Sequence, residues 1–333
     1  MIDQHIQNTI LCTTQATSIE PGERIQTLWS GYGQIFKATL RGMTTSSEPL
    51  PVVIKHVKWP THRQHPVGWV SDLSHQRKVT SYTVECAFYR RFASSCSTHC
   101  RVPKLIAIDN HADELLIILE DLDASGFPLR KYRLSSREIK LTLRWLACFH
   151  ATFLNVSPDT LWPVGTYWHL NTRPEELAAM ADAPLRQAAS DIDCALSDAT
   201  FQTLVHGDAK VANFCYARGG RDVAAVDFQY VGGGCGMKDV AYFLGSCLPE
   251  IECERQEAQL LDTYFGFLHS AVDALSRDVN FSALEREWRD LYHVAWVDFH
   301  RFIKGWTVEN WHQDDYSERV KRDVLAKIEK GML

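Results

Sequence analysis

The segment that most constrains this chain spans residues 204–228, LVHGDAKVANFCYARGGRDVAAVDF. It opens with an apolar pair and a polar HGD triplet, and two short apolar runs then flank the sequence ARGGRD. Two apolar runs joined by such a Gly-Gly turn signal are typical of a β-hairpin. Folding the segment back on itself is expected to bring Asp208, Asn213 and Asp227 to one edge, although they are far apart along the chain.

These three side chains suit phosphoryl transfer. The reaction needs one carboxylate that orients and deprotonates a hydroxyl, and hard oxygen ligands that hold Mg²⁺ against the phosphates of a nucleotide such as ATP. Asp208 is the candidate catalytic base, while Asn213 and Asp227 are the candidate metal ligands.

The motif H-G-D-x-K-x-x-N followed by V-D-F resembles the catalytic and metal loops of the aminoglycoside phosphotransferase and choline kinase superfamily. The surrounding residues, VDFQYVGGGCGMKDVAYFL, are most similar to its ecdysteroid kinase-like branch. The resemblance implies an α+β, bilobal protein-kinase-like fold. It would have a small antiparallel β-sheet lobe with one main helix and a larger, mostly helical lobe, with ATP and Mg²⁺ held between them.

The resemblance also implies that His206 and Asp239 support the catalytic loop structurally. Asp239 precedes an apolar helical run and is expected to be its N-cap. The glycine-rich residues 232–236 are expected to form a flexible loop near the site. Lys210 has two interpretations, as a group that neutralises the transferred phosphoryl group or as an ordinary surface lysine.

Composition narrows the class of protein. With 333 residues and 45% apolar content, the chain is long enough for two domains, and a net charge of −6 without a large basic patch argues against nucleic acid as a partner. No run approaches the length of a membrane-spanning helix, and the N-terminus lacks the pattern of a signal peptide. Ten cysteines, mostly in apolar segments, are consistent with reduced thiols in the cytoplasm.

The N-terminal part is expected to bind the nucleotide. Residues 1–24 have no pattern and are interpreted as a leading arm, and a β-hairpin over residues 25–41 carries Gly31 and Gly33 at its turn. Such glycines let backbone amides approach phosphates, although an ordinary turn would look the same. Lys55 lies in a short apolar strand, where a lysine is awkward unless it meets an anion.

A helix over residues 81–92 is predicted next, and its Glu85 is expected to pair with Lys55 and orient it on the α- and β-phosphates. The long polar stretch of residues 59–79 is predicted to be an insertion loop that is either functional or mobile. Further on, an apolar strand turns acidic and resembles the hinge of the kinase-like fold, where backbone groups of Glu120 to Leu122 would meet an adenine edge.

The boundary is placed at this hinge, about residues 120–123, giving a nucleotide-binding lobe (1–122) and a catalytic and acceptor-binding lobe (123–333). The second lobe is predicted to be mostly helical, with long helices over residues 136–155, 250–275 and 281–306. Aromatic residues from Trp288 to Trp306 recur at helical spacing. They form either a core stripe or one wall of an acceptor pocket, and aromatic faces bind quaternary ammonium groups or flat apolar bodies.

Departures from protein kinases favour a small-molecule kinase. Gly207 stands where protein kinases have an arginine, Gln229 replaces the glycine after the metal-loop phenylalanine, and no A-P-E segment follows. Choline-like, aminoglycoside-like and steroid-like alcohols are all open as acceptors, as are ATP or GTP preference and oligomeric state. The alternative is a nucleotide-binding pseudokinase or regulatory scaffold without turnover, but a decayed kinase would have lost some of these site residues.

Overall fold

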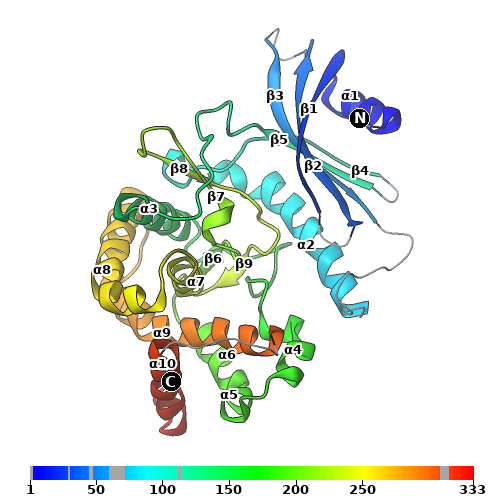
Figure 1. Cartoon of the computed structure of the whole chain (residues 1–333). Coiled ribbons are helices and arrows are strands. Elements are labelled where there is room, and N and C mark those ends of the chain that lie inside the picture. Colours follow the sequence, from blue (N-terminus) through cyan, green and yellow to red (C-terminus); the bar gives the residue numbers. More distant parts are fainter. Residues whose placement is uncertain (1–2, 29–30, 45–47, 60–71, 112–113, 308–314) are drawn as a thin grey trace.

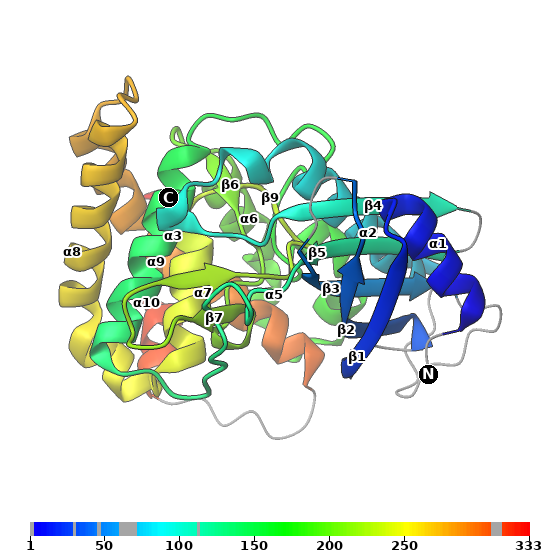
Figure 2. The same ribbon diagram turned by 90° about the horizontal axis from the view of Figure 1, so that it is seen from above.

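The computed structural model describes residues 3–28, 31–44, 48–59, 72–111, 114–307 and 315–333. An antiparallel five-stranded sheet with its covering helices forms one side of the molecule, and the later helices with two short strand pairs form the other (Figure 1). Figure 2 shows the same division from above. The predicted α+β class, with an N-terminal antiparallel sheet and a helical C-terminal part, is therefore confirmed.

The five strands of the sheet are antiparallel and lie in the order β1 (Ser18–Thr27), β2 (Gly33–Arg41), β3 (Leu50–Lys58), β5 (Glu114–Glu120) and β4 (Leu105–His111). Side chains alternate between its two faces, as strand geometry requires. On one face, Val52 and Ile54 pack with Ile10 of α1 (Gln4–Thr14). On the other face, Val57 packs with residues of α2 (Asp72–Arg91).

Two expectations for this part are wrong. Residues 1–24 are not an arm, because α1 is capped by the Asp3 side chain and β1 begins at Ser18. Ile6 and Ile10, one helical turn apart, are buried against the sheet. The apolar spacing of a helix is therefore present in the sequence, but it extends over too few residues to be recognised. Helix α2 also begins before the predicted residue 81. Residues 60–71 of the predicted insertion lie outside the described residues, and the rest of its C-terminal end is helical.

The C-terminal part is built around long helices. Helix α3 (Ser136–Thr152) starts with a capping box between Ser135 and Glu138 and packs along α8 (Glu250–Ala274). The other helices are α4 (Pro174–Ala179), α5 (Ala183–Gln187), α6 (Ala189–Ser197), α7 (Met237–Cys247), α9 (Phe281–Trp306) and α10 (Asp315–Glu329). Single turns of 3-10 helix are η2 (Ala93–Ser95), η3 (Thr98–Cys100), η4 (Leu170–Thr172) and η5 (Val211–Asn213). Both α7 and α6 pack on α9.

Two short strand pairs lie between the sheet and these helices (Figure 1). They are β6 (Thr203–Val205) with β9 (Gly232–Gly234), and β7 (Phe214–Tyr216) with β8 (Val223–Ala225). The second pair is the predicted hairpin, and its turn falls at the Gly219-Gly220 pair. The division into domains 1–122 and 123–333 stays a prediction, and β5 ends at its boundary.

The glycine-rich segment was predicted incorrectly. It is an ordered strand rather than a flexible loop, because a Cβ on Gly232 would lie 2.2 Å from the carbonyl oxygen of Trp162 and only glycine permits this approach. Asp239 is not the N-cap of α7, which begins at Met237 with Gly236 in the cap position. Its carboxylate instead accepts hydrogen bonds from the backbone of His206 and Gly207.

Candidate active site

Lys55 lies in the middle of β3 on the face covered by α2. Its Nζ is 2.6 Å from Oε2 of Glu85 and 3.3 Å from Oδ1 of Asp227. Burial by itself lowers the pKa of Lys55, but the negative charges of Glu85 and Asp227 outweigh it and raise the pKa above its ordinary value. The structure thus brings the two predicted residues of the sheet side into contact with each other and with the metal loop.

The metal loop is held against α2 by its aromatic residue. Phe228 stacks on Phe88 of α2, with ring centroids 3.9 Å apart and planes inclined by 11°. The preceding Asp227 has a φ of 69°, an uncommon conformation for a residue other than glycine. Gln229 donates a hydrogen bond to Oδ1 of Asp227. Burial raises the pKa of Asp227, but Lys55 and the bond from Gln229 hold it below its ordinary value.

Asp208 lies in the loop between β6 and β7 and is only 5% exposed. Its Oδ2 accepts hydrogen bonds from Lys210 Nζ at 3.0 Å and Asn213 Nδ2 at 2.9 Å, and its Oδ1 accepts one from the Tyr242 hydroxyl at 3.3 Å. Burial raises the pKa of Asp208 above its ordinary value, although the charge of Lys210 opposes this. Lys210, whose side chain is 41% exposed, thus lies beside the candidate base, and its two interpretations stay open.

A buried network fixes the backbone of this loop. Asp239 is fully buried and accepts the N–H of His206 at 2.5 Å and that of Gly207 at 2.9 Å. It also lies 3.2 Å from Nε2 of His150, whose Nδ1 is 2.8 Å from the Tyr264 hydroxyl. The same carboxylate therefore ties the loop to α3, α7 and α8.

His206 connects the two halves of the folded-back segment. Its Nε2 is 3.1 Å from the carbonyl oxygen of Val226, and its Nδ1 accepts the N–H of Asp208 at 3.2 Å. The Val226 N–H in turn donates to the carbonyl of Asn213 at 3.0 Å. These bonds set the loop carrying Asp208 beside the strand ends that carry Asn213 and Asp227.

The donor set near Asp227 fits a magnesium ion that also binds nucleotide phosphates. Asn213 points its amide nitrogen at Asp208, and within the described part of the chain its Oδ1 and the Oδ2 of Asp227 accept no hydrogen bond. Mg²⁺ commonly takes one or two protein oxygens and completes its shell with water and phosphate. Among the described residues no cluster of three or more acidic, histidine or cysteine ligands forms a metal cage.

Residues 31–33, which we call the glycine turn, connect β1 to β2 and are held in place by β3 and α2. A Cβ on Gly33 would lie 2.1 Å from the carbonyl oxygen of His56, so only glycine fits. Gly31 has a φ of +77° with open space around it. Between them, the Tyr32 hydroxyl lies 2.5 Å from Nδ1 of His75 on α2. The turn is therefore fastened to the helix that carries Glu85.

The segment predicted as the hinge has its side chains engaged elsewhere. Both carboxylate oxygens of Glu120 lie 2.5 Å from Arg101 Nη2, and its own N–H donates to the Lys104 carbonyl. The carbonyl of Leu122 accepts the Phe127 N–H at 2.8 Å, whereas the Leu122 N–H has no acceptor in the described residues. An unpaired backbone donor on a buried residue is uncommon and fits an edge-on ligand.

The aromatic residues of α9 lie mainly in two largely buried clusters. Trp288, Tyr292 and Trp296 are at most 2% exposed and belong to the main core. One and two turns further, Phe299 and Phe302 pack instead with residues around the site. These are Tyr167, Trp168 and Tyr242. We call this second group, residues 167, 168, 242, 299 and 302, the aromatic wall.

The aromatic wall reaches Asp208. The Tyr167 hydroxyl lies 3.1 Å from the Tyr242 hydroxyl, which donates to Asp208. Sequence reasoning missed both tyrosines: Tyr167 belongs to no motif, and Tyr242 lies in the stretch that resembles the ecdysteroid kinase-like branch but was given no role in the site. It also missed Lys78, which falls within residues 59–79, predicted to be an insertion loop; its spacing of seven residues from Glu85 could have placed it on the same face of a longer helix.

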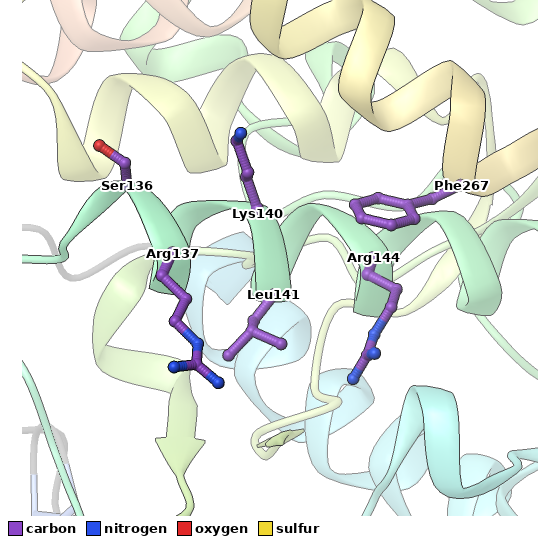
Figure 3. Close-up of a pocket in the computed structure, with 6 residues that line it drawn as sticks. All are labelled: Ser136, Arg137, Lys140, Leu141, Arg144 and Phe267. Carbon is purple, nitrogen blue, oxygen red and sulfur yellow. The ribbon is translucent and has the colours of Figure 1, made fainter. Parts of the chain in front are cut away.

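Two surface hollows lie away from these groups. One, of about 330 Å³, is lined by Ser136, Arg137, Lys140, Leu141 and Arg144 of α3 and by Phe267 of α8. Figure 3 shows Arg137 and Arg144 on one side of α3 with Leu141 between them, and Lys140 on the other side. The other hollow is lined by residues of α6, α9 and the C-terminal end of the chain. Neither includes a candidate site residue.

No helix within the described ranges combines the length and apolar character needed to cross a membrane.

Comparisons with known proteins agree with the sequence resemblance. The profile of the ecdysteroid kinase-like family matches residues 165–277, which contain both loops of the site. This match confirms the resemblance to that branch over those residues. A search of curated proteins found no match.

Three solved kinases align with the chain. An aminoglycoside 3'-phosphotransferase of type VIII is 12% identical, with a TM-score of 0.42, over 86% of this chain and 100% of its own. The GDP complex of aminoglycoside 2'-phosphotransferase-IIIa is 12% identical, with a TM-score of 0.45, over 99% of this chain and 100% of its own. An ethanolamine kinase from Plasmodium vivax is 13% identical, with a TM-score of 0.46, over 96% of this chain and 85% of its own.

Proposed function

We propose that this protein is an ATP- and Mg²⁺-dependent small-molecule kinase that transfers the γ-phosphoryl group to a hydroxyl of a small metabolite. The observation that carries the proposal is the convergence of distant groups. Lys55 of the sheet contacts Asp227 at 3.3 Å, and the loop pairing through His206 sets Asp208 and Asn213 beside Asp227. The match to the ecdysteroid kinase-like family also supports a kinase that acts on a small molecule.

Each residue has a role in the proposed reaction. Lys55, held by Glu85, would bind the α- and β-phosphates, and Asn213 and Asp227 would hold Mg²⁺. When bound, the metal supplies charge neutralisation on the phosphate oxygens. Asp208 would accept the proton of the acceptor hydroxyl, and the rise in its pKa on burial makes it a stronger base. The remaining acceleration would come from alignment of the two reactants.

The nucleotide base would lie at the end of β5. The free N–H of Leu122 supports this position, because adenine presents an acceptor on the edge that faces a hinge backbone. The Glu120 side chain, paired with Arg101, would support the segment rather than touch the ligand. Gly31 and Gly33 would bring backbone amides over the phosphates.

The acceptor would lie against the aromatic wall next to Asp208. Two acidic groups that adjoin the wall are already paired, Asp298 with Arg301 at 2.8 Å and Glu176 with Arg173 at 2.8 Å. A polycationic aminoglycoside needs several unpaired carboxylates, whereas aromatic faces suit a flat apolar body or a single quaternary ammonium. We therefore favour a steroid-like or choline-like alcohol as the acceptor.

The direct test is phosphoryl transfer from ATP to a panel of hydroxylated steroids, choline-like amines, sugars and aminoglycosides, with Mg²⁺ present. Wild type should show acceptor-stimulated turnover, and Asp208→Asn should reduce it at least about 10²-fold, the usual contribution of a general base. Asp222→Asn is the matched control, because this aspartate is half-exposed in the hairpin of the same segment. Equal background rates in wild type and Asp208→Asn with every acceptor would refute the kinase and favour a scaffold.

A further inference from the structure

A second lysine faces the site from α2. Lys78 lies seven residues before Glu85, with Tyr82 between them, so the three side chains share one face of the helix. The Nζ of Lys78 lies 4.8 Å from the centroid of the Tyr82 ring, and the Nζ of Lys55 lies 5.3 Å from the same centroid. The ring therefore has two ammonium groups beside it.

These two ammonium groups are neutralised very differently. Lys55 has carboxylates at 2.6 Å and 3.3 Å. Lys78 is half-buried, and in the described part of the chain its Nζ makes one hydrogen bond, to the neutral Oε1 of Gln229 at 3.0 Å. No carboxylate of the described residues lies within ion-pair distance of it. An ammonium group has three donors, so two of those on Lys78 bond to no atom of the described residues.

The surroundings of Lys78 favour an anion. Burial and the nearby positive charge of Lys55 outweigh the more distant carboxylates of the site and lower the pKa of Lys78 to about 8. A buried ammonium group without a carboxylate partner lowers the stability of the protein unless a bound anion compensates its charge. The contacts of α2 define where that partner would lie.

Lys78 stands between the glycine turn and the metal loop. Three residues before it, His75 binds Tyr32 of the glycine turn at 2.5 Å. On its other side, Gln229 links it to Oδ1 of Asp227. Lys55 already covers the part of the site next to Glu85, so a phosphate chain bound between the turn and the metal loop would meet Lys78 on the side nearer the turn.

We propose that Lys78 is a second phosphate-binding cation, which contacts the terminal phosphate of the bound nucleotide while Lys55 contacts the inner ones. This inference rests on the proposed nucleotide-binding function and deepens it. It predicts that Lys78 distinguishes a nucleoside triphosphate from a diphosphate, because only the triphosphate carries the group that it touches.

The test is the affinity of Lys78→Met for Mg²⁺ with a non-hydrolysable ATP analogue and, separately, with ADP, measured by isothermal titration calorimetry. A charge-assisted hydrogen bond is worth a factor of about 10 to 100 in affinity. We expect that loss for the triphosphate and a change of less than about twofold for ADP. Lys78→Arg should retain most of the triphosphate affinity. Lys140→Met, which removes an exposed lysine on α3, should bind both nucleotides like wild type.

Other outcomes are decisive too. Equal weakening of both nucleotides by Lys78→Met would mean that the lysine only supports α2, and unchanged affinities would mean that it has no phosphate contact; either result overturns the inference. A wild-type protein that binds neither nucleotide would instead refute the proposed function. Thermal unfolding of each variant checks that the fold is retained, and Ser81→Ala, which removes another bond to Gln229 at 3.1 Å, separates loss of that bond from loss of the charge.

Discussion

Replacing Asp239 by Asn tests the buried brace of the catalytic loop without any knowledge of the substrate. The Asp239 carboxylate accepts two backbone N–H groups, from His206 and Gly207, and contacts His150, and no part of its side chain is exposed. An asparagine has the same shape but only one acceptor oxygen. In either orientation, its NH₂ group would point at a donor that the carboxylate now satisfies.

The cost follows from these contacts. Losing one hydrogen bond to a charged acceptor costs about 1.5–3 kcal/mol, and leaving a buried donor unpaired costs about 1–3 kcal/mol. Allowing for overlap between the two, we expect Asp239→Asn to lose about 3–5 kcal/mol. For 333 residues the unfolding entropy is about 0.7 kcal/mol/K, so the melting temperature should fall by about 4–7 °C.

Differential scanning calorimetry of wild type and Asp239→Asn measures this loss directly. Asp273→Asn is the matched control, since its side chain is 71% exposed and the same chemical change should shift Tm by less than 1 °C, within the range of about ±0.5 kcal/mol expected for surface substitutions. If Asp239→Asn melts within about 1 °C of wild type, the carboxylate does not hold the loop, and the structural role of His206 and Asp239 is wrong.

Three further predictions concern separate groups. Asp227→Ala is expected to abolish turnover and weaken Mg²⁺-nucleotide binding, because it removes the only anionic metal ligand proposed; near-normal turnover in the phosphoryl transfer assay contradicts the assignment. Lys55→Ala should lose most of the thermal stabilisation that ATP gives to wild type, and an ATP-induced shift equal to that of wild type would rule out its phosphate contact. Asp182 bonds to Lys304 and Lys321, which outweigh burial and lower its pKa to about 2. Since the unfolded value is about 3.9, the stability that it contributes is fully present above about pH 5 and is lost as the pH falls toward 2. Asp182→Asn should therefore flatten the fall of Tm across that window, and an equally steep fall would show that the native pKa is not depressed.

Local patterns predicted much of the fold. The short apolar run around Lys55 and the apolar or aromatic spacing of α3 and α9 identified main elements, since both patterns are read within a few residues. The same reasoning failed for α1, whose short apolar repeat was hidden among polar residues. It also failed for β9, where the glycines serve close backbone packing against Trp162, a partner distant in sequence.

Sequence spacing alone brought Asp208, Asn213 and Asp227 together, because one hairpin joins them and its geometry is local. Only the tertiary structure revealed that Lys78 bonds to Gln229, which is 151 positions away. It also revealed that the first half of α9 packs in the main core, whereas its second half packs in the aromatic wall beside Asp208. Periodicity identifies the buried face of a helix but not what packs on it. That choice depends on how separate elements fill space against one another, and it is made only when the whole chain folds.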